Sequence, residues 1–349
     1  MTALAATNRG RAFERLVVPD ELQARVPPER RGIRRDEVSL MVTTPAGISQ
    51  KRFVDLGDDL RPGDLLVVNN SKTLPAAVDV DDQTIVHFST ELPGGLQVVE
   101  LRRPSGAGSS PRSDIAPGTV EFPKSGRLEI LAPYPVTSTS GRLWAAHLEG
   151  IDRTTLLREH GRPITYRYAA RASLRSYQTV FAIRPGSAEM PSAARPFSTK
   201  LVASLVASGV SIAPLTLHAG VSSLESGELP YPEWYDVPSS TASLVNHVRD
   251  RGGRVVAVGT TVVRALETVT DDTGVTHPGR GWTDLVVGAE YTVRGIDGLI
   301  TGWHEPSSTH LHMLEAVAGR ELVEKSYRIA LELGYLWHEF GDSHLLLPS

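Results

Sequence analysis

The hydrophobic pattern of this chain changes character twice, near Leu74 and near Ile164, and this limits the folds open to it. Before the first change, the run LLVVNN (65–70) is short, apolar and β-branched and follows a Pro-Gly turn, as a buried strand does. Beyond Arg175, apolar strand-like runs alternate with helix-like segments. We therefore expect an α/β fold that is interrupted by a region of different texture.

The middle region consists of short segments such as TIVHFSTEL, LQVVELRR and RLEILAPY, separated by turns rich in Gly, Pro and Ser. Period-two alternation at this spacing predicts a small barrel or sandwich rather than βαβ units. We predict an inserted small β-barrel domain at residues 75–164 and a discontinuous α/β main domain formed by residues 1–74 and 165–349. Within the insert, PSGAGSSPRSD (104–114) has almost nothing to bury, which predicts a mobile surface loop.

The region after Arg175 reads as alternating helices and strands. STKLVASLVASG (198–209) begins with a capping serine and ends with a glycine, as a helix does, and SIAPLTLHAG then reads as a strand. SSTASLVNHVRDRGG, RVVAVG and TTVVRALETV read as helix, strand and helix, and the last helical region is interrupted near Gly319. With 349 residues the chain exceeds the usual size of one compact domain, which favours two.

Composition excludes several classes of protein. The absence of cysteine rules out disulfides, thiolate zinc sites, iron–sulfur clusters and a cysteine nucleophile. A net charge of −4 gives no global attraction for polyanions, so nucleic-acid binding needs a local patch, such as the arginines at 30, 31, 34 and 35. The start, MTALAATNRGRAFERL, lacks a signal-peptide run, and no window approaches the roughly 20 apolar residues of a membrane span. We expect a cytoplasmic protein without membrane association.

The stretch VVAVGTTVVRALE (255–267) is an apolar strand that meets a glycine and then two threonines at the start of a helix. Free N–H groups and the positive helix end suit an anionic group, and Gly259 would let a ligand approach the backbone. Thr260 and Thr261 therefore join Gly259 as candidate binding residues. The competing interpretation is a plain helix cap.

Two further segments carry candidate site residues. His218, in TLHAG, follows a predicted strand, and ligands of α/β proteins gather at the carboxyl ends of strands. A hydrogen-bonded structural histidine is the alternative. Glu233, Trp234 and Tyr235 combine a carboxylate with two aromatic rings, as a site for a flat ligand does, and an aromatic cluster that closes the core is the alternative.

The stretch GWHEPSSTHLHM (302–313) places three histidines and a glutamate close together. It is not an HExxH zinc motif, because Pro306 ends any helix that begins before it, and we expect no metal. Ser308 and Thr309 mark the start of a helix, with His310 and His312 in its first turns. His304 then lies in the loop before that helix, which is a better place for chemistry.

Several segments together resemble one family, the S-adenosylmethionine:tRNA ribosyltransferase-isomerases of queuosine biosynthesis. The resemblance covers most of the chain outside residues 79–165, and the matching segments occur in the same order as in the family. They are PGDLLVVNNSKTLPAAV (62–78), SYQTVFA (176–182), TLHAG (216–220), EWYDVP (233–238), GGRVVAVGTTVVRALE (252–267), GWTDL (281–285), LITGWHEPSST (299–309) and GDSHLL (341–346).

The resemblance implies a mixed α/β main domain with a β-barrel inserted after the VVN strand. It also implies that S-adenosylmethionine is a substrate, whose ribosyl part moves to the aminomethyl group of a 7-deazaguanine in tRNA while adenine and methionine leave. The sulfonium acidifies the neighbouring C5′ hydrogens, so a base has to remove one and a donor has to protonate adenine. We assign His218 and His304 to proton transfer as hypotheses.

The same resemblance and side-chain chemistry suggest the substrate-binding residues. Gly259, Thr260 and Thr261 would hold a polar or anionic part of the substrate, with Arg264 one helical turn further on. The residues that would flank a ring are Tyr177, Gln178 and Trp234, with Glu233 beside them.

The chain also departs from the family pattern at polar positions. Two family histidines are replaced by Pro196 and Tyr231, and an aspartate by Asn70. Other family residues are replaced by Lys72, Ala77, Ala194, Gly302 and Ser307. The lost basic groups weaken the case for a phosphate-rich partner such as tRNA.

The family reaction is our first interpretation. A paralogue that acts on S-adenosylmethionine or a related nucleoside with a small-molecule acceptor is the leading alternative, and a non-catalytic nucleoside- or tRNA-binding protein is the second. Adenine release separates the enzymes from the binding protein, and a tRNA requirement separates the two enzymes.

Overall fold

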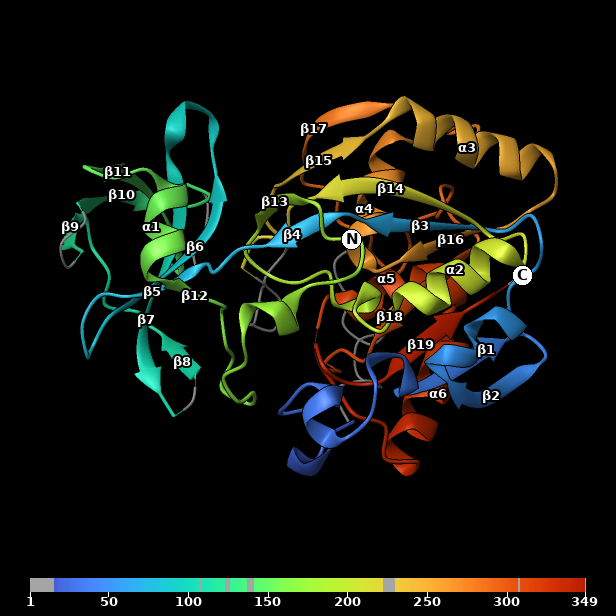
Figure 1. The fold of residues 1–349 in the computed structure, drawn as a ribbon. Coiled ribbons are helices and arrows are strands. Elements are labelled where there is room, and N and C mark those ends of the chain that lie inside the picture. Colours follow the sequence, from blue (N-terminus) through green and yellow to red (C-terminus); the bar gives the residue numbers. More distant parts are fainter. Residues whose placement is uncertain are drawn as a thin grey trace, which may run out of the picture.

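The computed structural model describes residues 16–106, 108–122, 126–136, 141–221, 230–306 and 308–348. The start of the chain, Met1–Arg15, and Ser307 lie outside these ranges. Two sheets dominate the fold, and Figure 1 shows them side by side. None of the helices among the described residues has the length and apolar character that crossing a bilayer requires.

The larger sheet is mixed and has nine strands. In spatial order they are Gly279–Thr283 (β17), Glu233–Val237 (β15), Ser211–Leu217 (β14), Leu65–Asn69 (β3), Val255–Val258 (β16), Gly298–Gly302 (β18), Ser343–Leu346 (β19), Ser39–Thr44 (β1) and Gly47–Arg52 (β2). The four central strands, β14, β3, β16 and β18, are parallel to one another. Their carboxyl ends therefore lie along one edge of the sheet.

Helices cover both faces of this sheet. Thr199–Ala207 (α2) packs on one face, and the helices of the other face are Ser239–Asp250 (α3), Thr260–Val269 (α4), His310–Ala318 (α5) and Arg320–Glu332 (α6). Strand β3 is buried along its whole length. Leu65 and Val67 pack in the cluster with α3 to α6, while Leu66 and Val68 pack in the cluster with α2, since successive side chains point to opposite faces.

The second sheet has eight strands, all between Ala77 and Arg162. Their order is Gly161–Arg162 (β12), Ala77–Asp79 (β5), Ile85–Glu91 (β6), Gln97–Ser105 (β7), Leu143–Glu149 (β11), Arg127–Pro133 (β10) and Gly118–Glu121 (β9), with Gly108–Pro111 (β8) paired to β7. Arg153–His160 (α1) packs its buried leucines, Leu156 and Leu157, into the core of this sheet. The order does not confirm closure into a barrel, and the domain limits at 75 and 164 stay a prediction.

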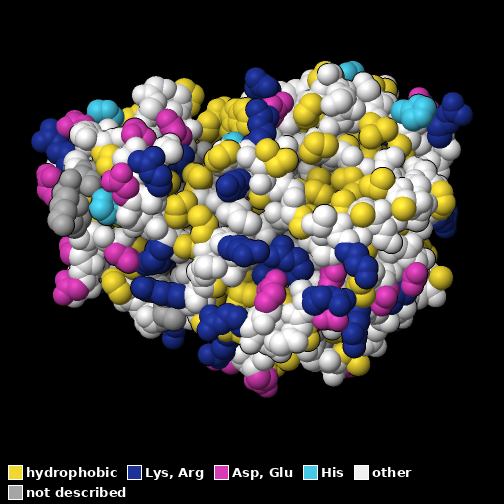
Figure 2. All heavy atoms as spheres, viewed as in Figure 1, with side chains coloured by type: hydrophobic (Ala, Val, Ile, Leu, Met, Phe, Trp, Pro, Cys, Tyr) yellow, Lys and Arg dark blue, Asp and Glu magenta, His cyan; other side chains and the backbone are white. Residues whose placement is uncertain are grey.

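A small two-stranded sheet links the two large ones. Ser71–Thr73 (β4) directly follows the end of β3 and pairs in parallel with Arg184–Ser187 (β13). The chain then enters β5 and returns from β12 through residues 163–183. Figure 2 shows Lys and Arg side chains gathered across the middle of the face it draws, where the chain passes between the sheets in Figure 1.

Most predicted elements are confirmed, and one is wrong. The helix at 198–209 is α2, and Ser198 caps it by accepting a hydrogen bond from the Leu201 N–H at 3.1 Å. The helix break at Gly319 separates α5 from α6. The predicted loop at 104–114 instead begins as a hairpin of β7 and β8, because the buried Arg102 side chain binds Ser109 through both the hydroxyl and the carbonyl oxygen.

Asn69, at the end of β3, is fully buried and joins three elements. Its amide nitrogen donates to the Leu217 carbonyl at 2.8 Å and to the Thr261 hydroxyl at 3.2 Å. Its oxygen accepts from the Ser71 N–H at 3.0 Å and from the Leu217 N–H at 3.1 Å. One side chain therefore fixes the ends of β14, β3 and the first turn of α4 together.

We predict that Asn69→Ala lowers the free energy of unfolding by about 3 kcal/mol, because it leaves several buried polar groups without partners. The neighbouring Asn70→Ala is the control, since the Asn70 side chain accepts one hydrogen bond, from Thr216 at 2.7 Å, and about 1 kcal/mol is expected there. Urea unfolding measures both values. An equal loss in the two variants would contradict the joining role of Asn69.

Candidate functional site

A cavity of about 470 Å³ lies between the two sheets. The second sheet contributes Ser89, Val98 and Leu143 to its lining, and the large sheet contributes the residues that follow β16 and β18. Its volume is in the range of small-molecule sites, and its place at the carboxyl ends of parallel strands is typical of α/β enzymes. Six of the ten predicted site residues line it: Glu233, Gly259, Thr260, Thr261, Arg264 and His304.

The turn from β16 into α4 forms one side of the cavity. Gly259 has a φ of 98°, a conformation that favours glycine, and its N–H donates to the Ile300 carbonyl at 2.8 Å. Thr260 and Thr261 begin α4, where the first N–H groups have no partner within the helix. The predicted junction is present and borders the cavity, while its binding role stays a prediction.

Arg264 lines the cavity one turn further along α4, and four of its five N–H donors have partners in the protein. The guanidinium forms an ion pair with Glu233 and donates to the carbonyl oxygens of Leu285 at 3.0 Å and Thr283 at 3.1 Å. Glu233 also accepts from the Gly220 N–H at 2.9 Å. Burial raises the pKa of Glu233, and the positive charge of Arg264 opposes this. The pair braces α4 against β15 and holds the guanidinium at the cavity wall.

His304 faces the cavity together with His310, which the sequence alone did not mark as a site residue. The two rings stack with centroids 4.4 Å apart and planes 4° from parallel. A nitrogen of each ring has a hydroxyl partner: His304 Nε2 lies 3.0 Å from the Thr301 oxygen, and His310 Nδ1 lies 2.7 Å from the Ser308 oxygen. Burial lowers the pKa of His304 well below its usual value and that of His310 to about 4. Both imidazoles are therefore neutral at pH 7.

A second group of cavity residues comes from two distant segments. Tyr166, Tyr168 and His338 form an aromatic wall, in which Tyr168 stacks on Tyr166 at 6.0 Å and on His338 at 4.0 Å. His338 Nε2 lies 3.2 Å from Glu305, and Glu339 lines the cavity beside it. Sequence reasoning missed this wall, although the spacing Tyr-x-Tyr in YRYAAR was a signal that aromatic rings recur on one side of the chain.

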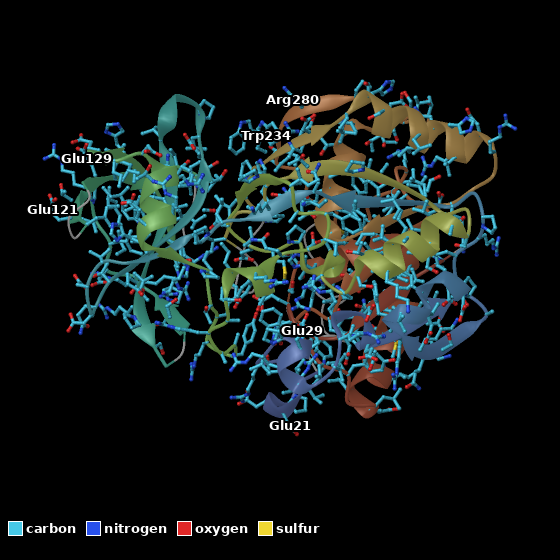
Figure 3. The ribbon with its side chains drawn as sticks, in the orientation of Figure 1. Glu21, Glu29, Glu121, Glu129, Trp234 and Arg280 are labelled. Carbon is cyan, nitrogen blue, oxygen red and sulfur yellow. The ribbon has the colours of Figure 1, made fainter. Side chains whose placement is uncertain are left out.

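His218 does not line the cavity. Its Nδ1 lies 2.7 Å from the Ser71 oxygen, which in turn lies 2.6 Å from the Ser187 oxygen. The ring stacks on Trp234 with centroids 5.1 Å apart, and burial lowers its pKa to about 4. Figure 3 shows Trp234 above the junction of the two sheets. These contacts fit the structural alternative, and proton transfer by His218 stays a prediction.

Tyr177 and Gln178 also lie outside the cavity lining. Tyr177 is buried against Phe340, with ring centroids 5.1 Å apart. Gln178 bonds the backbone of Thr73 twice, donating to its carbonyl at 2.9 Å and accepting from its N–H at 3.2 Å. Both side chains fasten the connection between the sheets. Of the three residues predicted to flank a ring, none borders the cavity.

The substituted family positions divide between cavity and scaffold. Tyr231 and Gly302 line the cavity. Asn70, Ala77, Ala194 and Pro196 are at least half-buried and do not line it, Lys72 is exposed, and Ser307 lies outside the described residues. Most departures therefore leave the cavity wall unchanged.

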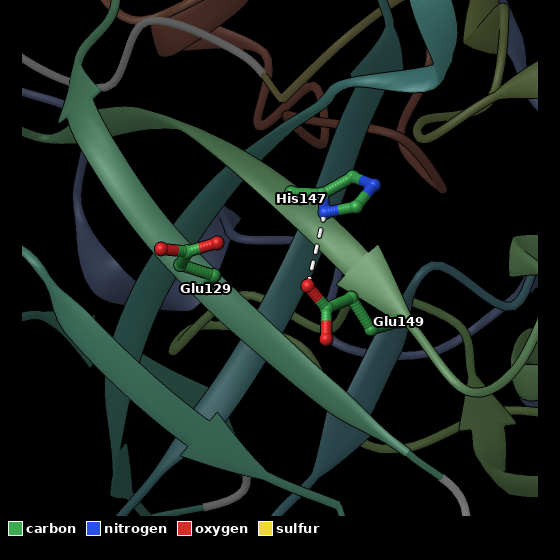
Figure 4. Close-up of side chains that lie close together, drawn as sticks. All are labelled: Glu129, His147 and Glu149. Carbon is green, nitrogen blue, oxygen red and sulfur yellow. Dashed lines mark ion pairs between the residues drawn. The ribbon is translucent and has the colours of Figure 1, made fainter.

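One group of side chains among the described residues has the spacing of a metal site, and none of its three members lines the cavity. Glu129 of β10 and His147 and Glu149 of β11 face one another on the second sheet (Figure 4). Arg127 binds Glu149 at 2.6 Å and supplies the positive charge there. All three residues are at least partly exposed, so this group reads as a solvated surface cluster.

The partly buried His310 leads to a prediction about how stability depends on pH. Folding lowers the pKa of His310 from 6.5 to about 4. Between pH 6.5 and about pH 4, His310 therefore carries a proton in the unfolded chain but not in the folded one. The folded state loses stability as the pH falls through this range. The wild type should therefore lose roughly 2 kcal/mol more unfolding free energy than His310→Gln when the pH is lowered from 7 to 5. Urea unfolding at both pH values measures this. The exposed His312→Gln on the same helix is the control, and an equal difference there would contradict the assignment.

Comparison with known proteins agrees with this architecture. A family model described as "Queuosine biosynthesis protein" matches residues 14–346. The S-adenosylmethionine:tRNA ribosyltransferase-isomerase of Symbiobacterium thermophilum is 35% identical over 344 residues, which cover 95% of this chain and 97% of that protein. The protein of the same name from Moorella thermoacetica is 36% identical over 330 residues, covering 90% and 94%.

A solved structure also resembles this chain. The crystal structure of S-adenosylmethionine tRNA ribosyltransferase from Thermotoga maritima is similar over 95% of this chain and 99% of that one, with 26% identity and a TM-score of 0.53. Its mixed α/β fold matches, and the resemblance inferred from the motif segments is confirmed. The chain belongs to the queuosine biosynthesis protein family.

Proposed function

We propose that this protein is an S-adenosylmethionine:tRNA ribosyltransferase-isomerase, which moves the ribosyl part of S-adenosylmethionine to a 7-aminomethyl-7-deazaguanine in tRNA and releases adenine and methionine. The named relatives support the reaction class. The observation in this chain that carries the proposal is the chemistry of the cavity, where neutral imidazoles, carboxylates and an aromatic wall surround one space.

The charges in the cavity suit a cationic substrate. Four glutamates line it, at positions 189, 233, 305 and 339, against one arginine, Arg264. Glu233 is paired with Arg264, and burial favours the neutral form of Glu339, so Glu189 and Glu305 supply the negative charge. A sulfonium and an ammonium group gain electrostatic stabilisation in such surroundings, and a phosphate does not. The lining therefore supports S-adenosylmethionine as the ligand of the cavity, and we expect the phosphates of a nucleic acid to bind outside it.

His304 is the candidate base for the C5′ hydrogen. It borders the cavity, its pKa is lowered by burial so that the ring is unprotonated at neutral pH, and its Nε2 is held by Thr301. Stacking on His310 fixes the plane of the ring. An imidazole has to be unprotonated before it can accept a proton, and burial keeps His304 in that form.

The deciding measurement is the release of adenine and methionine from S-adenosylmethionine, followed by chromatography with and without tRNA that carries the aminomethyl-deazaguanine base. We expect release with that tRNA. Release without it would indicate a small-molecule acceptor, and bound S-adenosylmethionine without release under either condition would indicate a binding protein.

For His304→Ala, we expect adenine release to slow by roughly two to four orders of magnitude while S-adenosylmethionine still binds. His312→Ala is the matched control, because His312 lies in the same segment but is 55% exposed at its side chain and does not line the cavity. Unchanged turnover in His304→Ala would remove this residue from the mechanism.

We assign tRNA contact to exposed arginines next in sequence to the cavity wall, rather than to the cavity itself. The predicted N-terminal patch is largely committed to the fold, since Arg34 pairs with Asp36 and Arg35 with Glu29. In contrast, Arg167, Arg171 and Arg175 are exposed, and they are absent from the ion pairs of the described residues. We call these three side chains the arginine ridge. Arg167 lies between Tyr166 and Tyr168 of the cavity wall in the sequence, and the other two arginines follow.

If the ridge contacts phosphates, the double variant Arg171→Gln, Arg175→Gln raises KM for tRNA and lowers the slope of log affinity against log salt by about one for each lost contact. Affinity for S-adenosylmethionine stays the same. The exposed Arg251→Gln, at the end of α3, is the control for a general charge effect. A salt slope that does not differ between the double variant and the wild type would contradict tRNA contact at the ridge.

A further inference from the structure

The strongest feature that the proposed mechanism does not use is the Glu339 carboxyl in the cavity wall. Its Oε2 is buried and has no hydrogen-bond partner among the described residues. Tyr168 lies near enough to the same carboxyl that its hydroxyl lowers the Glu339 pKa. Burial raises the pKa of Glu339, which favours the neutral acid. A buried polar atom without a partner is costly, so such an atom beside a cavity points to a ligand.

The turn that carries Glu339 is held rigidly. Asp342 accepts hydrogen bonds from the Leu336 N–H at 2.7 Å and from the Ser39 N–H at 2.8 Å, and so fastens the turn to β1. A Cβ at Gly341 would lie 2.3 Å from the Leu336 carbonyl, so this position requires glycine. The direction of the carboxyl is therefore set before any ligand arrives.

Backbone strain marks the same turn. His338 has a φ of 72°, and it is the one residue other than glycine with a positive φ among the described residues. Such a conformation costs about 1 kcal/mol or more and persists where the surroundings enforce it, commonly at ligand sites. Here it sets the imidazole parallel to Tyr168, with an angle of 17° between the planes.

We propose that Tyr168, His338 and Glu339 form the subsite for the adenine ring of the substrate, with the Glu339 carboxyl recognising the edge at which a ring nitrogen adjoins the 6-amino group. This inference rests on the proposed function, since it assigns a part of that substrate. It moves the ring subsite from Tyr177, Gln178 and Trp234, which lie outside the cavity lining, to a wall of the cavity itself.

The hydrogen-bond complement of a carboxylic acid fits this edge. The acid offers one O–H donor and one carbonyl acceptor, and the adenine edge offers a ring nitrogen that accepts and an amino group that donates. Two parallel hydrogen bonds result. A purine without the 6-amino group retains only one of them, and an aromatic wall beside the carboxyl supplies the flat surface that a base prefers.

The test uses 5′-methylthioadenosine and its analogue without the 6-amino group, because neither can enter the transfer reaction. Calorimetry gives the affinity of each nucleoside for the wild type, Glu339→Ala and Glu339→Gln. We expect the wild type to prefer the amino compound by roughly tenfold, which is the worth of about one hydrogen bond. In Glu339→Ala the preference disappears, whereas Glu339→Gln retains it, because the amide also offers one donor and one acceptor in the same plane.

The ratio of the two affinities is the decisive quantity, because a general loosening of the fold would weaken the binding of both nucleosides equally. A preference that persists in Glu339→Ala overturns the proposal, and so does a loss of preference in Glu339→Gln equal to that in Glu339→Ala. Adenine release by the wild type is measured separately. Release with an unchanged ratio in Glu339→Ala refutes the subsite alone, and a Glu339-dependent ratio without release refutes the transfer reaction alone.

Discussion

The fully buried side chain of Asn69 is the interaction on which the cavity depends. It stands at the end of the central strand β3, where the main chain leaves the large sheet for the second one. Through four hydrogen bonds it fixes the end of β14, the start of β4 and the first turn of α4 in one arrangement. A buried amide that satisfies donors and acceptors on three elements leaves little freedom for slippage between them. The Gly259 turn therefore meets the second sheet at a set position.

Burial, more than charge pairing, determines the protonation of the groups around the cavity. His304 and His310 lose the charged form because water is excluded from them, and the Glu339 carboxyl is driven toward its neutral form for the same reason. The two effects have opposite chemical consequences, since the imidazoles become acceptors ready for a proton and the carboxyl becomes a donor. A space with acceptors on one wall and a donor on another suits a reaction that removes one proton and adds another elsewhere.

The sequence predicted the parts of the site that depend on local pattern. The Gly259 turn and His304 follow strands whose apolar runs are easy to recognise, and the carboxyl ends of parallel strands share one edge. His218 also follows such a strand, β14, but its side chain is directed to Ser71 and Trp234, and no local pattern reports that direction. The sequence therefore predicted the position of His218 at the end of β14 correctly, but not the direction of its side chain.

The aromatic wall was beyond local pattern for a different reason. Tyr168 and His338 are separated by 170 positions, and their contact exists only because the segment after β12 and the turn before β19 pass each other in the folded chain. The prediction of a mobile loop at 104–114 was wrong because of a contact that lies nearby in the sequence. The small residues of this segment suggested that it buries nothing, whereas Arg102 on strand β7 binds Ser109 and orders the hairpin. In both cases the structure depends on a contact between two residues, and the sequence around each residue does not predict that contact.

The distribution of charge explains how a chain with a net charge of −4 can serve both a cation and a polyanion. Glu189 and Glu305 line the cavity, where low polarity and exclusion of water strengthen the effect of a carboxylate on a sulfonium. The arginine ridge lies in solvent on the segment that also supplies Tyr166 and Tyr168. One short stretch thus contributes rings to the cavity and cations to the surface, so a phosphate backbone held on the ridge would bring a neighbouring base near the cavity. Net charge is summed over the whole chain, and for that reason it carries no information about either region.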